Sequence, residues 1–499
     1  MLRTTEMGVT ESTHDPPVTL PRVSPIPGDA AAEAFLSPAR WSGSPHDRLD
    51  SAGYRIEELV VAGEARIFVD GHARPPHQST ERASYATRVL AIRPARDEEF
   101  SGVVHLELLN PSTGADFPMF WPDAGAHLLR RGHAYIGITC KRVTVDALRR
   151  VSTGRYGGLR FGHDGAIWDL IGAVGAACHR DQASGLLPGL RAPERTLING
   201  WSQSGSFLRT YLSEGLHELH RRELGFDPYD GYLIGVSSGA FGPLGYVNVD
   251  RDGEAEFDEE LRPLTPLTII GLDDPRRVVR GSRVPVIEFM SEEEAVTHLW
   301  HQRPDSDVPG DLYRCYQVPA RGHDTGLLDD RVRAADHKAL GNPTPTGQEL
   351  PVRHRASQYL LAATLDNLLA WTHGVPAPRA DPIPLRVDAE FVRDPLGVDY
   401  SGVSAVTDAD GHALGGLRYL EVELPIARMR ADSRDAPAMN PWSHHPFDTV
   451  ELHRRYGSPA ALREHAGRVI ARLVTERWYT PDDAADAAGA FMRSLPDRW

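Results

Sequence analysis

The sequence predicts an α/β protein with a mostly parallel central sheet that is flanked by helices. Short apolar segments rich in Val, Ile, Tyr and Thr, which are typical of strands, recur along the chain. Segments with apolar residues at helical spacing lie between them. Strands that alternate with helices indicate βαβ units, and therefore a mostly parallel sheet. The 499 residues are 41% hydrophobic and 25% charged, which is an ordinary globular composition with ample chain for a large core.

The sheet is expected within the first 380 residues. Residues 1–50 are polar and rich in proline, and they predict a loose leader or a strap over the surface. The core is expected over residues 51–380, with strands at 56–68, 85–92, 103–109, 134–139, 196–199, 231–236, 284–290 and 313–318. The predicted helices between them are 124–131, 164–179 and 203–219. Residues 239–282 form a long acidic insert with little periodicity, which is typical of a lid or a substrate-shaping cap.

The last part of the chain predicts a C-terminal β/α extension, residues 381–499, packed on the core. An amphipathic helix is expected over 356–373, and a proline-rich break follows it. Short strands and turns are expected over 385–430. Two helices near 459–476 and 481–494 close the chain, the second with Thr480 as N-cap and Pro481 in its first helical position.

Charge and cysteine content exclude several classes of function. The formal net charge is -15, and an acidic protein repels phosphate backbones and anionic lipid heads, so nucleic-acid binding is not expected. Cys140, Cys178 and Cys315 are far apart and form no CxxC pair, which argues against a disulfide framework or a zinc–thiolate site. There is neither an apolar signal-peptide region nor a stretch long enough to span a membrane. We therefore expect a cytoplasmic protein without a membrane span, metal or cofactor.

The most informative segment is 196–205, TLINGWSQSG. A short apolar strand runs into GWSQS at 200–204, and a helix follows at once. This strand–turn–helix context is that of a nucleophile elbow, G-x-S-x-G, in which small residues flank a sharp turn that lifts Ser202 Oγ above the sheet. Ser204 departs from the pattern but is small enough for the turn. The alternative interpretation is that Ser202 is an ordinary N-cap, which is common before helices.

His323 is the candidate base for this serine. The strand at 313–318 ends in a small, turn-rich segment, 319–324 (PARGHD). The histidine also follows the serine, as the order Ser…acid…His requires. The chain has 22 histidines, of which His133, His163 and His373 compete in poorer contexts. The alternative interpretation is that His323 is a solvated loop histidine.

The acid is expected between the serine and the histidine, just beyond a strand. The strand at 284–290 ends in SEEE at 291–294, and a spacing of three residues past the small residue selects Glu294. Its carboxylate would accept the Nδ1–H of His323 and stabilise the imidazolium. Glu292 stays a second candidate, and a solvated acidic turn is the alternative interpretation. Asp324 is disfavoured because it is adjacent to His323 in the sequence.

Two backbone N–H groups are needed to hold an oxyanion. One is that of Gln203, which is expected at a helix N-terminus. The second should come from the loop after the strand at 103–109, which begins NPSTGAD. Pro111 has no N–H, which leaves Asn110 or Ser112 as donor. A plain turn is an equally good interpretation of this loop.

These motifs resemble the long "alpha/beta hydrolase domain" family of bacterial and fungal proteins. The matching segments are 107–110 (ELLN), 155–157 (RYG), 200–204, 291–294, 319–324, the helix with Trp371, the Gly415-Gly416 turn and 474–478 (VTERW). The resemblance covers nearly the whole chain after about residue 50, and it implies an α/β-hydrolase fold with a Ser–acid–His triad. The family often has aspartate where Glu294 stands and alanine where Gly322 stands, and the first departure bears on the acid.

Together the motifs predict a serine hydrolase that cleaves a carboxylic ester or lactone, with a small-molecule ester or acyl substrate as its partner. Two alternatives stay open. The acyl-enzyme could pass to an alcohol or amine, which would make an acyltransferase or cyclising enzyme, or the fold could be a catalytically inactive scaffold. There is no HExxH or paired histidine–carboxylate motif to indicate a metalloenzyme. Trp121, Trp168 and Trp201 could line an apolar pocket, although aromatic residues at such positions are more often core.

Overall fold

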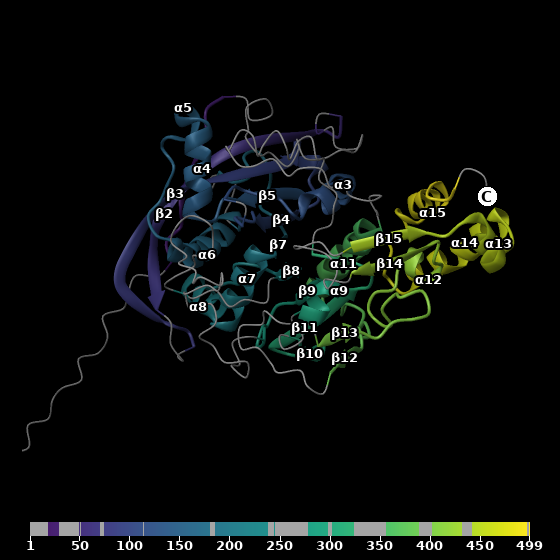
Figure 1. Cartoon of the computed structure of the whole chain (residues 1–499). Helices are drawn as coiled ribbons and strands as arrows, with labels where there is room; N and C mark the ends of the chain where they lie inside the picture. Colours follow the sequence, from purple (N-terminus) through teal and green to yellow (C-terminus); the bar gives the residue numbers. More distant parts are fainter. Residues whose placement is uncertain are drawn as a thin grey trace, which may run out of the picture.

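The structure is a computed structural model that describes residues 18–28, 49, 51–69, 74–112, 114–179, 185–237, 244, 278–297, 302–323, 356–388, 402–431, 442–496 and 499. Within these ranges the largest sheet has eleven strands in the order β1-β2-β3-β5-β4-β7-β8-β9-β11-β10, with β6 paired to β3. Helices lie against it on both sides, and the C-terminal part of the chain gathers at one end of the molecule (Figure 1). The α/β architecture expected from the sequence is confirmed.

The centre of the sheet is parallel. Its six strands are β5 (Ala134–Ile138), β4 (Val103–Leu108), β7 (Arg195–Trp201), β8 (Gly231–Gly235), β9 (Val286–Ser291) and β11 (Asp311–Val318). The antiparallel strands are β1 (Arg22–Pro25), β2 (Tyr54–Val69), β3 (His77–Pro94), β6 (Arg160–Phe161) and β10 (Ser306–Val308). Every residue of β4, β5, β8 and β9 is buried, because helices cover both faces of a parallel sheet.

Two hydrophobic clusters lie on opposite faces of this sheet. On β8, Tyr232 and Ile234 belong to one cluster and Leu233 to the other, as the alternation of side chains along a strand requires. The first cluster includes residues of α4 (Arg142–Val151), α5 (Thr153–Tyr156), α6 (Ile167–Cys178), α7 (Gln203–Ser213) and α8 (Leu216–Leu224). The second includes residues of α3 (Trp121–Arg131) and α11 (Ala356–Thr372). Shorter elements are η2 (Asp97–Glu99), η3 (Asp164–Ala166) and α9 (Glu292–Thr297).

The described residues of the C-terminal extension, 381–499, pack on the second face. Its elements are β12 (Leu385–Val387), β13 (Val403–Ala405), α12 (Leu420–Glu423), β14 (Ala427–Ala431), β15 (Trp442–Pro446), α13 (Thr449–Tyr456), α14 (Pro459–Thr475) and α15 (Ala484–Arg493). Trp478 meets Tyr316 of β11 edge to face, with ring centroids 5.3 Å apart. Tyr479 meets Tyr359 of α11 at 5.5 Å. The second cluster therefore runs without a break from the sheet into the extension.

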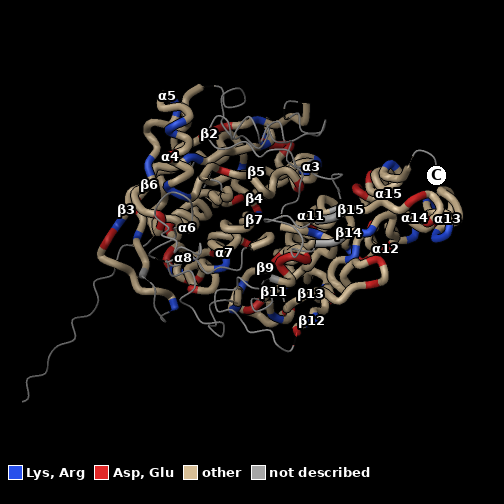
Figure 2. Tube along the Cα trace, viewed as in Figure 1, with Lys and Arg blue, Asp and Glu red and all other residues tan. Residues whose placement is uncertain are grey.

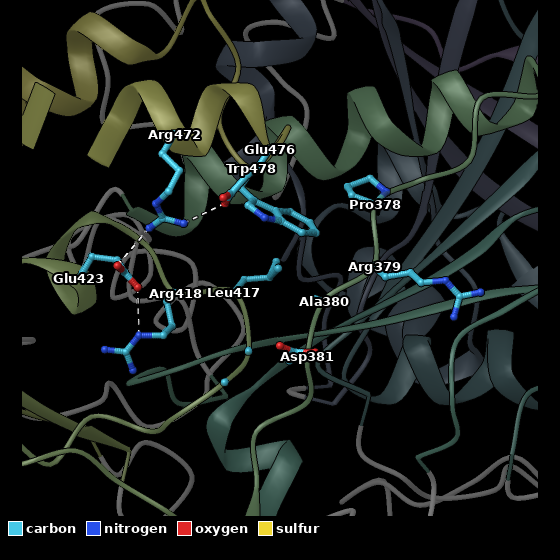
Figure 3. A pocket seen from close by; sticks show the side chains of 12 residues that line it. Pro378, Arg379, Ala380, Asp381, Leu417, Arg418, Glu423, Arg472, Glu476 and Trp478 are labelled. Carbon is cyan, nitrogen blue, oxygen red and sulfur yellow. Dashed lines mark hydrogen bonds and ion pairs between the residues drawn. The ribbon is translucent and has the colours of Figure 1, made fainter. Parts of the chain in front are cut away.

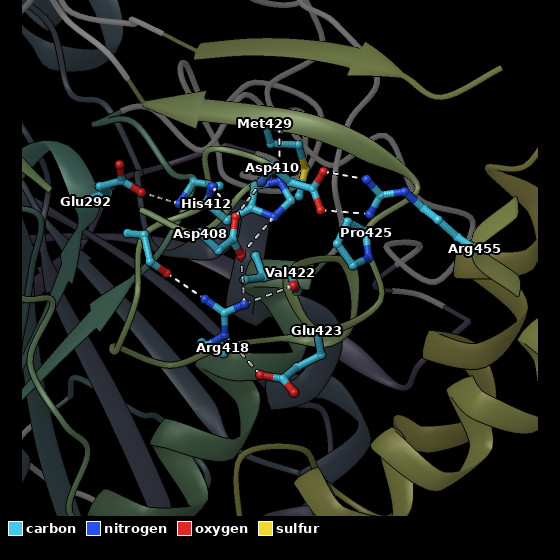
Figure 4. Close-up of polar contacts among 12 residues, drawn as sticks. Glu292, Asp408, Asp410, His412, Arg418, Val422, Glu423, Pro425, Met429 and Arg455 are labelled. Carbon is cyan, nitrogen blue, oxygen red and sulfur yellow. Dashed lines mark hydrogen bonds and ion pairs between the residues drawn. The ribbon is translucent and has the colours of Figure 1, made fainter. Parts of the chain in front are cut away.

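A polar turn in the extension is fixed by its own side chains (Figure 4). Asp408 Oδ1 accepts the backbone N–H groups of Asp410 and His412, at 2.9 and 3.0 Å. Arg418 donates to the carbonyl oxygen of Ala413 at 2.7 Å. Ala413, at the end of this turn, packs against Ala295 of α9. The extension therefore supports the short helix that follows β9.

Several expectations are wrong in detail. The helix expected over 203–219 is two helices, because Gly215 adopts a φ of 76° between α7 and α8. The last helix begins at Ala484, while Thr480 Oγ1 accepts the N–H of Asp483 in the preceding turn. The sequence analysis also missed α4 and α13.

The expected leader and insert are described only in part. Four residues of the leader form β1, which pairs with β2 at the edge of the sheet. Edge pairing needs only main-chain hydrogen bonds, so it leaves no pattern in the side chains. Most of the insert at 239–282 lies outside the described residues. In the part of the chain that is described, no helix is both long and apolar enough to cross a membrane.

Two buried histidines make the stability of this fold sensitive to acid. His105 Nε2 and His133 Nδ1 lie 3.0 Å apart, and both rings are buried. Burial lowers the pKa of His105, and it lowers the pKa of His133 to about 3. Between the pKa of an unfolded histidine, about 6.5, and the lower folded value, only the unfolded state binds the proton. Stability is therefore complete above about pH 6.5 and falls as the pH decreases, by about 1.4 kcal/mol per pH unit for each histidine.

We expect His133→Asn, which keeps an acceptor near His105, to reduce this loss by about 2 kcal/mol between pH 7 and pH 5. Urea unfolding at both pH values measures the change in the free energy of unfolding. His453→Asn is the control, because His453 is exposed. Equal pH dependence in the His133 variant and the wild type would contradict the prediction.

Candidate active site

Ser202 stands at a sharp turn between β7 and α7. Its backbone has φ 55° and ψ -121°, a conformation that L-residues rarely adopt, and its N–H donates to the carbonyl oxygen of Gly235 at 3.0 Å. A Cβ atom at Gly200 would lie 2.5 Å from the backbone oxygen of Ser204, so only glycine fits there. This is the geometry that the strand–turn–helix pattern predicts for an elbow.

Ser204 replaces the second glycine of the usual pattern, and its side chain closes the turn. Ser204 is fully buried. Its Oγ accepts the N–H of Trp201 at 2.9 Å and donates to the carbonyl oxygen of the same residue at 3.0 Å. The hydroxyl therefore gives hydrogen-bond partners to the buried N–H and carbonyl groups of Trp201.

His323 follows β11 and reaches the elbow. Its Nε2 lies 2.8 Å from Ser202 Oγ. The competing histidines are engaged elsewhere: His133 contacts His105, His163 Nδ1 accepts the N–H of Gly165 at 2.9 Å, and His373 Nδ1 accepts from Arg195 at 3.1 Å. Of these four histidines, His323 is the one that the structure brings to Ser202.

Glu294 binds the other side of the same imidazole. Its Oε1 lies 2.6 Å from His323 Nδ1, and its carboxyl group is buried. Its Oε2 accepts the N–H of Ser291 at 3.0 Å and also the hydroxyl of Ser291. Ser291 Oγ in turn accepts the N–H of Glu294 at 3.4 Å. This reciprocal pair is a capping box at the start of α9, so one carboxylate both begins the helix and holds the histidine.

The neighbouring glutamates hold the main chain of the histidine segment. Glu292 Oε2 accepts the N–H of Ala320 at 2.6 Å, so Glu292, the second candidate for the acid, binds the backbone instead of the imidazole. Glu293 Oε2 accepts the N–H of His323 at 2.8 Å. The sequence analysis did not predict either contact. The three glutamates lie beside the end of β9, where acidic residues are drawn in red in Figure 2. Asp324 lies outside the described residues.

Comparison with known proteins identifies the family. A family model described as "Alpha/beta hydrolase domain" matches residues 22–488. The chain belongs to this family. The resemblance noted from the sequence motifs is therefore confirmed.

Solved structures similar to this alpha/beta hydrolase include several esterases. The esterase Est22 is 14% identical, with a TM-score of 0.30, over 58% of this chain and 80% of that chain. Est1E from Butyrivibrio proteoclasticus, with ferulic acid bound, is 10% identical, with a TM-score of 0.29, over 52% and 94%. A thermostable esterase from Pseudomonas putida is 12% identical, with a TM-score of 0.27, over 56% and 81%. No curated protein matches the sequence.

The loop after β4 is hydrogen-bonded to the elbow of this family member. The N–H of Ser112 donates to Asn110 Oδ1 at 2.8 Å, and the N–H of Asn110 donates to the carbonyl oxygen of Phe117 at 2.9 Å. Both amides considered for the second oxyanion contact therefore bind within the loop in this arrangement. Asn110 Nδ2 donates to the carbonyl oxygen of Trp201 at 2.7 Å, a contact that the sequence did not indicate. Gln203 is the first residue of α7, as expected.

Backbone strain gathers at the same edge of the sheet. Four non-glycine residues in the described ranges have positive φ. Three of them lie just beyond the ends of parallel strands: Ser202 after β7, Val236 after β8 and Ala320 two residues past β11. Such conformations persist where the surrounding structure holds them, and they cluster at functional sites. The carboxyl ends of these strands are also where the serine, the histidine and the acid meet.

Three other kinds of site were considered: an aromatic pocket, a surface pocket in the C-terminal extension and a metal site. Trp121, Trp168 and Trp201 are buried in the hydrophobic clusters, so the interpretation as core residues holds. A pocket of about 570 Å³ lies between segment 378–381, the turn at 415–418 and α14 (Figure 3). Arg472 in its wall pairs with Glu423 and Glu476, and neither Ser202, His323 nor Glu294 lines it. Across the described ranges, no group of three or more His, Cys, Asp and Glu side chains is placed to hold a metal ion.

Proposed function

We propose that this chain is a serine hydrolase that cleaves a carboxylic ester or lactone through an acyl-enzyme on Ser202. The observation that carries the proposal is the continuous chain of contacts from Ser202 Oγ to His323 Nε2 and from His323 Nδ1 to Glu294 Oε1. Serine, imidazole and carboxylate in this order form the arrangement that activates a serine hydroxyl. Membership in the alpha/beta hydrolase domain family supports the same reaction class.

The reaction proceeds in two halves. Ser202 Oγ attacks the substrate carbonyl carbon while His323 Nε2 takes the hydroxyl proton, and Glu294 stabilises the imidazolium through Nδ1–H. The Gln203 N–H, at the start of α7, is the first donor to the oxyanion. The leaving alcohol takes the proton from Nε2 and leaves an acyl group on Ser202. Water then repeats the sequence, which releases the acid and restores the serine.

Delivery of the same acyl group to an alcohol or amine would make the protein an acyltransferase or cyclising enzyme. That reaction uses the same three residues and differs in whether water is excluded from the site. Product analysis with an added alcohol or amine separates the two, since transfer gives a new ester or amide in addition to the acid.

We expect a fluorophosphonate probe to form a single adduct on Ser202, located by peptide mapping. Ser202→Ala should lose the adduct, and His323→Ala should slow labelling by at least about 10³-fold, because the base is removed. His163→Ala is the matched control and should label like the wild type. A folded wild-type protein that takes no label on Ser202 would contradict the proposal and favour an inactive scaffold.

A further inference from the structure

We propose that Glu293 is a positioning residue of this site, which fixes the main chain of His323 and whose negative charge makes the imidazole a stronger base. The inference rests on the proposed function, because it assigns a partner to the base of that reaction. The acid of the triad would then act together with a second carboxylate from the same turn of helix.

The first part of the argument is geometric. Residues 319–323 follow β11 as turns and irregular chain, so they have no strand or helix of their own to hold them. Glu293 makes two hydrogen bonds to this segment. Its Oε2 accepts the N–H of His323 at 2.8 Å, and its own N–H donates to the carbonyl oxygen of Arg321 at 3.4 Å. The neighbouring Glu292 binds the N–H of Ala320. With Glu294 at the imidazole, three successive glutamates thus bind three residues of one segment, Ala320, Arg321 and His323.

The second part is electrostatic. Among the described residues, His323 contacts Glu294 at Nδ1, Glu293 at the main-chain N–H and Ser202 at Nε2. Burial, and then the charge of Glu294, raise the pKa of Glu293, whereas His323 lowers it. An attraction between two groups acts equally on both, so the Glu293 carboxylate also favours the protonated form of His323.

The segment also carries a cation, Arg321, whose charge acts on residues of the C-terminal extension. Arg321 lies between Ala320 and His323 in this segment, and its side chain is mostly buried. Burial raises the pKa of Tyr419, and it raises that of Glu421 to about 7, while the charge of Arg321 lowers both values to a smaller extent. Glu421 of α12 is therefore the carboxyl group that faces this cation, and Glu293 stays the second carboxylate that acts on the imidazole.

Two substitutions separate charge from position. Glu293→Gln keeps an oxygen that can accept the N–H of His323 but removes the charge, whereas Glu293→Ala removes both. The readout is the rate constant for fluorophosphonate labelling of the full-length protein as a function of pH, which needs no knowledge of the natural substrate. Glu98→Gln is the control, because Glu98 is exposed on η2.

We expect Glu293→Gln to move the acid limb of the labelling profile to lower pH by about one unit, because loss of a nearby negative charge disfavours the imidazolium. Its alkaline plateau should stay within about threefold of the wild type. Glu293→Ala should lower the plateau by about 10- to 100-fold, because small misplacements of a base are costly. Rescue of the plateau by glutamine distinguishes a positioning role from a general loss of stability.

The outcomes are distinguishable. A wild-type protein that is folded but takes no label would overturn the proposed function and this inference with it. A wild-type protein that labels normally, together with a Glu293→Gln variant whose acid limb is unmoved, would overturn this inference alone. If the alanine variant does not fold, the glutamine variant decides the question, because it preserves the hydrogen bond.

Discussion

Glu294→Gln will reduce labelling and turnover by about 10³- to 10⁴-fold while the protein stays folded. A capping box accepts glutamine as well as glutamate, so the start of α9 is preserved through the bond to the N–H of Ser291. The amide cannot hold His323 in the correct tautomer or stabilise the imidazolium, and the equivalent loss in a serine protease triad is about 10⁴-fold. The labelling rate, compared at equal folded fraction by circular dichroism, measures the effect.

Matched variants make this result specific. Glu294→Ala should lose activity to the same extent and in addition lose about 1 kcal/mol of stability, since it removes the helix cap. Glu292→Gln should cost much less activity, because the Glu292 carboxylate accepts the backbone N–H of Ala320, whereas Glu294 binds the imidazole. If instead the Glu292 variant were the inactive one and Glu294→Gln stayed active, the acid would be wrongly assigned.

Arg88→Met is expected to destabilise the fold by about 3–5 kcal/mol, because it leaves buried carboxylates without their cation. The side chain of Arg88 donates to Glu58 at 3.0 Å and to Asp116 at 2.9 Å, and all three side chains are 0% exposed. Glu58 keeps a second cation in Arg155. Among the described residues, Asp116 then keeps only the neutral hydroxyl of Thr139 as a partner.

Urea unfolding at neutral pH measures this loss as a fall in the free energy of unfolding. Arg96→Met is the control, because Arg96 pairs with Glu99 at the surface with 69% of its side chain exposed, where such pairs contribute about 0–1 kcal/mol. Equal effects of the two substitutions would show that the buried pair does not contribute as argued. Since Asp116 lies in the loop that ties to the elbow, the Arg88 variant should also label more slowly at Ser202.

Local signals in the sequence were sufficient for the centre of the site. The elbow is a strand, a turn and a helix that follow one another without a gap, and the acid and the histidine lie three and five residues beyond the ends of β9 and β11. The spacing from Ser291 that selected Glu294 is also the spacing of a capping box, which gives the selection a physical reason. These features depend on neighbours in the sequence, so the sequence alone carries them.

The rest depends on contacts between distant segments. The bond from Asn110 to the carbonyl of Trp201 joins residues 91 positions apart, and its effect on the loop amides is invisible in a turn-forming sequence. The buried pair of Arg88 and Asp116 is likewise distant, and neither residue differs in type from many surface residues. The break at Gly215 was missed because leucines at helical spacing continue on both sides of it. Tertiary packing therefore decided the details that periodicity left open.

The positive φ angles of Ser202, Val236 and Ala320 have an evolutionary consequence. Each such residue costs about 1–3 kcal/mol, whereas glycine adopts the same torsion readily. A laboratory selection that rewards only thermal endurance would favour glycine at these positions, and at position 202 it would remove the reactive hydroxyl. A selection for turnover would retain the serine and accumulate compensating substitutions far from the strand ends. Adaptation to heat and gain of activity should therefore follow diverging mutational paths in this protein.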